Sequence, residues 1–248
     1  MQKQIIKMSV MQALLLVATL APSAQAAISL DRTRVIFDGN QKSVSLNINN
    51  QNEQFPYLAQ SWIEDDKGNK VQGPLTVLPP IQRLEPGKSS QVKIQGLPII
   101  NTLPQDRETL FYFNLREIPP KSNKPNSLQI ALQTRVKLFY RPGAIAIDSN
   151  KAAPQEKITL RRQGDRYVVD NPTAYYVTIV DGKPNGGVSA RGFTPLMVAP
   201  KSHGELSVSA SALGSKPELI YVNDYGGRPS LLFNCDDNQC RLMPSEKK

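Results

Sequence analysis

The sequence has few of the side chains that carry enzyme chemistry. Its 248 residues include one tryptophan, two cysteines and one histidine, His203, in the loop-like segment Pro200–Gly204. A histidine and cysteine metal site needs several such ligands, and a catalytic nucleophile needs a neighbouring base. We find no G-x-S-x-G motif, no P-loop, and no spacing that marks a catalytic carboxylate pair. These absences favour a binding protein without metal or cofactor over an enzyme.

Long apolar runs are also scarce. One short run, Val10 to Leu20, follows Lys3 and Lys7 and precedes the small-residue pattern Ala24-Gln-Ala26. This arrangement predicts a cleavable secretory signal peptide over residues 1–26. No later run approaches the roughly 18 apolar residues of a membrane span, so we expect no membrane insertion.

Basic residues outnumber acidic ones, 30 to 21, which gives a formal net charge of +9. Nucleic acid is an improbable partner of an exported protein, and the chain has no run of five or six consecutive basic residues. The positive charge is therefore expected to serve a specific carboxylate or general solubility.

The two cysteines, Cys235 and Cys240, are close in the sequence. In an oxidising compartment they are expected to form one disulfide around a tight hairpin, the alternative being two free thiols. A single local bridge does not make a disulfide scaffold, so hydrophobic cores must hold this fold.

Short alternating segments and 20 prolines point to β-structure with frequent turns. About seven strands are expected before residue 142, with turns every 8–12 residues, which is typical of an immunoglobulin-like sandwich. A second series of short strands follows. We therefore predict an all-β fold of two immunoglobulin-like β-sandwich domains, 27–146 and 147–248. Trp62 lies in a predicted strand, Tyr57–Glu64, and is expected to pack in the first core.

The longest alternation runs from Leu128 to Leu138. Apolar residues share one parity, and glutamine, alanine and basic residues share the other, which predicts a β-strand. Eleven residues at about 3.3 Å each span roughly 36 Å, long for a strand. The segment also ends in a basic cluster, Arg135, Lys137 and Arg141. It is either a central strand with one face in the core or an edge strand that accepts another chain.

Several motifs resemble one family closely. The longest is Leu103-Pro-x-Asp-Arg-Glu-Thr-Leu-x-Tyr-x-Asn-Leu-x-x-Ile-Pro-Pro120. The others are Ser29–Arg34, Tyr57–Trp62, Arg83–Gly87, Lys137–Pro142 and Asn223–Pro229. Together they resemble the periplasmic pilus chaperones, the PapD-like proteins of the chaperone–usher pathway, over essentially the whole mature chain. The short loop Lys121–Ser127 resembles the short-loop subclass, which builds thick rod-like pili.

The resemblance implies two domains in an L with a cleft between them. It implies that Arg34 and Lys137 lie in this cleft and hold the C-terminal carboxylate of a pilus subunit. It assigns Glu108, Arg141 and Asp224 to an interdomain charge network. Leu128, Ile130 and Leu132 would enter the groove of an incomplete subunit. From the residues alone, Arg34 would be a surface arginine, and the three network residues would form surface ion pairs worth about 0–1 kcal/mol each.

The resemblance also implies the partners and the location. The protein would act in the periplasm, bind and help fold pilus subunits by donating its long edge strand, and deliver them to an outer-membrane usher. Strand addition supplies affinity through main-chain hydrogen bonds, and a carboxylate anchor fixes the register. An uncapped edge also makes a self-capping homodimer plausible when the protein is free.

One difficulty concerns parity. Lys137 and Leu128 have opposite parity in the alternating segment. Both can serve one partner if the strand twists or bulges between them, or if the cleft approaches Lys137 from the other face. The competing interpretations are an immunoglobulin-like structural pilus subunit or adhesin and, behind it, an exported enzyme on a sandwich scaffold.

Overall fold

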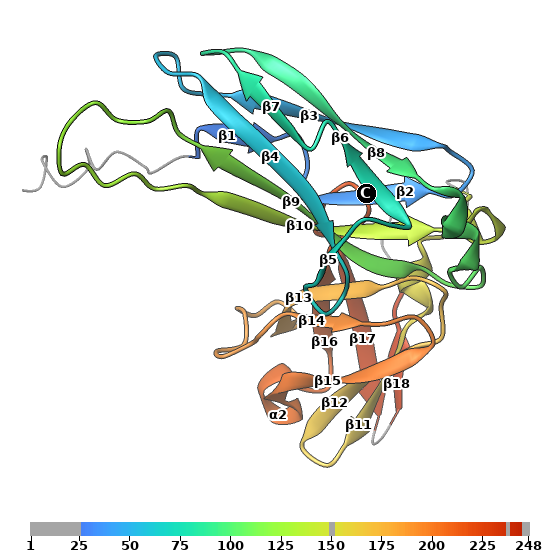
Figure 1. Cartoon of the computed structure of the whole chain (residues 1–248). Helices are drawn as coiled ribbons and strands as arrows, with labels where there is room; N and C mark the ends of the chain where they lie inside the picture. Colours follow the sequence, from blue (N-terminus) through green and yellow to red (C-terminus); the bar gives the residue numbers. More distant parts are fainter. Residues whose placement is uncertain (1–25, 149–151, 237–238, 245–248) are drawn as a thin grey trace, which may run out of the picture.

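The computed structural model describes residues 26–148, 152–236 and 239–244. These residues form two domains built almost wholly of β-strands, with one short helix, α2 (Ala210–Leu213). Figure 1 shows the domains meeting at a marked angle, which leaves a concave side between them. The all-β, two-domain prediction is confirmed. The predicted signal peptide, residues 1–26, lies outside the described residues except for Ala26.

The first domain is a sandwich of two sheets. Within the described residues, one sheet has the order β1 (Ile28–Leu30), β3 (Ser43–Asn50), β8 (Ser89–Gly96), β6 (Leu75–Leu78). The other has the order β2 (Arg34–Asp38), β10 (Gln133–Arg141), β9 (Thr109–Ile118), β4 (Tyr57–Glu64), β5 (Lys70–Val71), and β7 (Ile81–Leu84) pairs with β4. Alternate apolar side chains of the two sheets meet in one core, because successive residues of a strand point to opposite faces. Phe37, Leu46, Phe113 and Leu138 are among the most completely buried.

Trp62 does not lie in this core, so that prediction was wrong. Ala59, Ser61 and Ile63 of β4 face inward, and Trp62 therefore points outward with the opposite parity. Its indole ring lies between the guanidinium of Arg116, 4.9 Å from the ring centroid, and the ammonium of Lys70, 5.5 Å away. Favourable cation–π contacts keep this large aromatic side chain at the surface.

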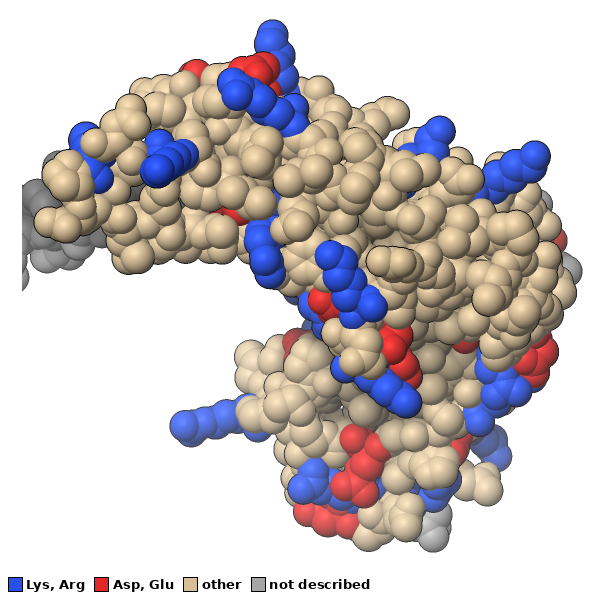
Figure 2. Space-filling model, in the orientation of Figure 1, with Lys and Arg blue, Asp and Glu red and all other residues tan. Residues whose placement is uncertain are grey.

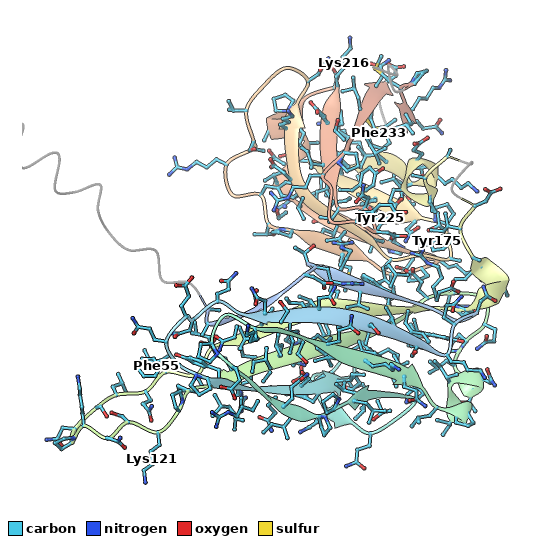
Figure 3. The ribbon with its side chains drawn as sticks, turned by 90° about the horizontal axis from the view of Figure 1, so that it is seen from above. Phe55, Lys121, Tyr175, Lys216, Tyr225 and Phe233 are labelled. Carbon is cyan, nitrogen blue, oxygen red and sulfur yellow. A yellow bond between two sulfur atoms is a disulfide. The ribbon has the colours of Figure 1, made fainter. Side chains whose placement is uncertain are left out.

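The second domain is built from one continuous series of paired strands whose two halves pack against each other. Among the described residues its strands follow the order β14 (Leu196–Val198), β13 (Val177–Pro184), β16 (Pro217–Tyr221), β17 (Ser230–Asp236), β18 (Gln239–Leu242), β11 (Thr159–Gln163), β12 (Arg166–Asn171), β15 (Ser202–Ser209). Side chains from both halves of this order form one core around Phe233, which Figure 3 labels inside the domain. The predicted disulfide is present: Cys235 and Cys240 join β17 to β18.

Three short 3₁₀ turns complete the described structure: η1 (Pro98–Thr102), η2 (Gly143–Ile145) and η3 (Pro154–Lys157). The turns η2 and η3 flank the connection between the domains. Tyr175 of the second domain donates a hydrogen bond from its hydroxyl to the carbonyl of Ile145 (2.6 Å), and so ties the start of this connection to the second domain.

The long alternating segment forms a shorter strand than predicted. β10 begins at Gln133, and Leu128–Leu132 belong to no strand. The neighbouring strand β9 ends at Ile118 and is followed by Pro119 and Pro120. Proline has no N–H to donate, so the ladder cannot continue along this neighbour. The last rung is the bond from the amide of Glu117 to the carbonyl of Leu132 (3.0 Å).

Candidate partner-binding site

The first feature of the site is an open strand edge on β10. The N-terminal segment beside this edge changes sheets, since β1 pairs with β3 and β2 pairs with β10. The parallel pairing with β2 begins only where Lys137 lies opposite Arg34. Residues Gln133–Val136 pair with β9 on one side, and within the described residues they have no strand partner on the other. Their backbone groups on that side are free to bind another strand.

A groove runs along this open edge. Thr134 and Val136 of β10 form one wall, Ile28–Leu30 of β1 form the other, and Arg32 and Thr33 close one end; its volume is about 360 Å³. The groove is the space that an added strand would occupy, because neighbouring strands lie roughly 4.7–4.9 Å apart.

The second feature is the exposed arm that precedes β10. Leu128, Ile130 and Leu132 are 88%, 65% and 42% exposed. Figure 3 shows this arm extending from the end of the first domain, with Lys121 on the limb of the loop that leads into it. Three apolar side chains of one parity beside an open edge form a surface that favours a strand partner with an apolar groove.

The third feature is a pair of cations at the end of the open edge. Arg34 and Lys137 are both partly buried, and within the described residues neither takes part in an ion pair. Arg34 donates to the carbonyl of Val222 (3.1 Å), but its Nε is buried without a partner. The ammonium of Lys137 donates to the hydroxyl of Thr178 (3.3 Å). Figure 2 shows Lys and Arg side chains on the concave side where the two domains meet. Two cations with spare donors form a suitable site for a carboxylate.

The structure resolves the parity difficulty. β10 keeps an unbroken register with β9 from Gln133 to Tyr140, so no bulge separates the arm from Lys137. Lys137 instead points from the outer face of the sheet toward the second domain, where Thr178 meets it. The cleft therefore approaches Lys137 from the face opposite the core.

Burial and the nearby charge of Arg34 lower the pKa of Lys137 below its usual range. Folding thus disfavours the charged form, and the wild-type protein gains stability as the pH rises through the lowered pKa toward 10.5. We expect Lys137→Met to raise the free energy of unfolding at pH 7 by about 0.5–1 kcal/mol, a modest gain because the side chain is partly exposed. Urea unfolding measures this change.

Lys93→Met is a matched control, since Lys93 is an exposed lysine on β8. Its effect should stay within about 0.5 kcal/mol. A clear loss of stability in Lys137→Met, beyond that of the control, would contradict the assigned desolvation of Lys137.

The domains are joined by a buried arginine. Arg141, at the end of β10, bridges Glu108 (2.8 Å) and Asp224 (2.7 Å), so the structure brings the three residues of the predicted network together. The side chain of Glu108 is 2% exposed, and it also accepts a hydrogen bond from the amide of Tyr176 (2.8 Å). Burial raises the pKa of the Glu108 carboxyl, against the lowering effect of the Arg141 charge. Such a group depends on its partner to remain ionised.

Sequence reasoning missed other contacts between the domains. Asp106 forms an ion pair with Lys201, and the rings of Phe139 and Tyr176 are in contact, tilted by 32°, with centroids 5.4 Å apart. The amide of Glu108 also donates to the carbonyl of Ala174 (2.8 Å). Single charged or aromatic residues far apart in the sequence carry no local pattern that could have signalled these pairs.

The site contains no constellation suited to a metal: within the described ranges, no three histidine, cysteine or carboxylate side chains come together as one would require. Nor does any helix of the described part have the length and apolar character to cross a bilayer. The geometry instead joins an open strand edge, an apolar arm and a pair of cations.

Comparison with protein-family models identifies both domains. Residues 27–146 match the model of the pili and flagellar-assembly chaperone PapD N-terminal domain, and residues 153–233 match that of the pili assembly chaperone PapD C-terminal domain. The chain belongs to the PapD-like family of pilus-assembly chaperones. The alternative of a structural pilus subunit or adhesin is not favoured.

Relatives of this chaperone have similar length. The probable fimbrial chaperone YfcS of Escherichia coli K12 is 52% identical over 98% of this chain and 96% of its own length. The chaperone protein PapD of Escherichia coli is 50% identical over 88% of this chain and 91% of its own. Among solved structures, the periplasmic chaperone SfaE has a TM-score of 0.68 at 30% identity, covering 83% of this chain and 98% of SfaE. This chain is therefore a pilus-assembly chaperone with the two-domain fold of the family.

Proposed function

We propose that this chaperone binds pilus subunits in the periplasm by adding a strand to their incomplete sheets, and that Arg34 and Lys137 anchor the subunit's C-terminal carboxylate. The observation that carries the proposal is the open edge of β10, which ends where the two cations lie. An added strand at Gln133–Val136 would place its terminus beside Arg34 and Lys137. Two cations can then fix the register, because a slip would leave charges unpaired.

The apolar arm completes the proposed site. Leu128, Ile130 and Leu132 would take the places of missing core side chains in the subunit, and the arm would become ordered as a strand on binding. That ordering extends β10 by the residues that the free chain leaves outside the strand. The favourable free energy of the contacts must exceed the entropic cost of ordering this segment, which favours partners that bury all three side chains.

The location and remaining partners are part of the same proposal. The N-terminal segment supports export into the periplasm, and SfaE is itself described as a periplasmic chaperone. Subunits held in this way would pass to an outer-membrane usher, and the loop Lys121–Ser127 would place the protein with chaperones of rod-like pili. Without a subunit, two copies could cap each other's open edges and form a homodimer.

A charged residue in the arm tests strand addition. Ile130→Asp is expected to lower the amount of subunit recovered with the chaperone from periplasm by at least about tenfold, because a carboxylate would be buried without a partner. Co-purification of a co-expressed pilus subunit measures the effect.

The neighbouring change Ala131→Asp is the matched control. Ala131 is exposed and has the opposite parity, so the new carboxylate would face solvent and recovery should fall less than about threefold. Equal recovery with Ile130→Asp and wild type, or equal loss with both variants, would refute the alternating insertion of the arm.

A further inference from the structure

A second cavity adjoins the groove along β10. It lies at the domain junction, has a volume of about 700 Å³, and contains Arg34 but not Lys137 among its lining residues. Arg32 and Thr33 line both the groove and this cavity, so the two spaces meet around these residues. A strand that follows the groove toward Arg34 therefore ends at the mouth of the cavity.

The cavity has an apolar part beside its charged residues. Ile36, Ile147, Pro154, Tyr221 and Tyr225 contribute apolar or aromatic surface. Ile36 has the same parity as Arg34 in β2, so both side chains project from one face of the strand. If Arg34 holds the terminal carboxylate of a partner, the side chain of that same terminal residue would lie within reach of this apolar surface.

Tyr225 is the most exposed of these side chains. It is 95% exposed, and within the described residues its ring has no aromatic or cation–π partner and its hydroxyl no hydrogen bond. Figure 3 places it at the boundary between the domains. An exposed tyrosine offers a large contact surface at low entropic cost, which is why tyrosine is enriched at binding hot spots.

The turn that carries Tyr225 is rigidly built. The side-chain oxygen of Asn223 accepts hydrogen bonds from the amides of Tyr225 (3.1 Å) and Gly227 (2.8 Å). Gly226 has a φ of +83°, and a Cβ at this position would lie 2.7 Å from the hydroxyl of Thr33. The turn is therefore seated against Thr33, the residue where groove and cavity meet.

We propose that this cavity, with Tyr225 at its rim, binds the side chain of the last residue of the bound subunit and prefers an aromatic or branched aliphatic one. The inference rests on the proposed carboxylate anchor, which brings that residue to Arg34. Asp31 and Asp224 also line the cavity, and they already pair there with Arg32 and Arg141. An acidic terminal side chain would therefore gain less from the cavity than an apolar one, because it would lose water without a new cation partner. The cavity is thus a specificity subsite next to the anchor.

The test uses the full-length mature chaperone and synthetic twelve-residue peptides with alternating apolar side chains. The peptides end in Phe, Ser or Asp, and each is made as free acid and as amide. For wild type, we expect the Phe acid to bind about tenfold more tightly than the Ser acid, and the Asp acid to bind most weakly. Fluorescence polarisation of labelled peptides measures the dissociation constants.

Two variants assign the preference to the cavity. Tyr225→Ala should bring the ratio of Phe to Ser affinities within about threefold while leaving the ratio of acid to amide unchanged. Tyr225→Phe retains the ring and should behave as wild type. Equal binding of Phe and Ser acids by wild type, or an unchanged ratio in Tyr225→Ala, overturns the subsite. Equal binding of acids and amides, or no binding of any peptide, overturns the anchor itself and the subsite with it.

Discussion

Lys137→Met is expected to abolish the preference of the chaperone for a free C-terminal carboxylate. Removing one partner of a partly buried, hydrogen-bonded charge pair costs roughly 2–5 kcal/mol. The free-acid form of a peptide copying a subunit's C-terminus should therefore bind at least about 30-fold more weakly to Lys137→Met than to wild type. The amide form should bind both proteins alike. Titration calorimetry with the acid and amide peptides measures the difference.

The control for this experiment is Arg135→Met. Arg135 lies on the same strand and the same face, but it forms an ion pair with Glu64 (2.8 Å). It should retain the preference for the acid. Because Lys137→Met is expected to be more stable than wild type, its loss of binding cannot be attributed to unfolding. Equal acid and amide affinities in wild type would contradict the anchor, and a retained preference in Lys137→Met would remove Lys137 from it.

Arg141→Ala should strongly destabilise the protein. It leaves the carboxylate of Glu108 buried without its cation, and breaking a buried pair in this way costs about 3–5 kcal/mol. The pKa of Glu108 is already raised by burial, and it should rise further in the variant. A carboxyl with a raised pKa in the folded state favours folding at low pH, and this contribution is lost as the pH rises through that pKa. The destabilisation should therefore be smallest near pH 5 and largest near pH 8.

Urea unfolding across this pH range tests the expectation. Arg161→Ala is the matched control, because Arg161 and Asp170 form a pair with 44% and 34% exposed side chains. Its effect should not exceed about 1 kcal/mol. Small-angle scattering of Arg141→Ala should also show a looser angle between the domains. An unchanged free energy of unfolding together with an unchanged scattering profile would refute the role of Arg141 at the junction.

Local patterns were sufficient to predict most of the strands. β3 and β4 were readable because their buried residues alternate with exposed ones in the sequence itself. The outward position of Trp62 could not be predicted from the sequence. The inward residues beside it include the small Ala59 and Ser61, and the largest residue of a strand is not always the core residue. The late start of β10 did have a signal in Pro119 and Pro120, which end the neighbouring strand β9, but the alternation after Leu128 obscured it.

The site depends on contacts that no local pattern contains. Alternation does not show which face of β10 meets the second domain, so the direction of the Lys137 side chain could not be predicted. Its hydrogen bond to Thr178 shows that it points toward the second domain. The open edge likewise results from the change of sheet between β1 and β2, which depends on their pairing partners. The network of Glu108, Arg141 and Asp224 was assigned through resemblance, since its residues are up to 116 positions apart, from Glu108 to Asp224.

The pairing of β2 with β10 limits how far another strand can add along the edge of β10. From Lys137 to Arg141, five successive positions of the strand edge are already occupied by the protein's own backbone. A partner strand that continued to pair with β10 past Lys137 would have to displace β2, whereas one that ends there would meet two cations. The same partner strand with extra residues at its C-terminus, such as a tag or a read-through extension, should therefore be rejected. Strand pairing at this edge would in this way select partner strands by the position of their C-terminus.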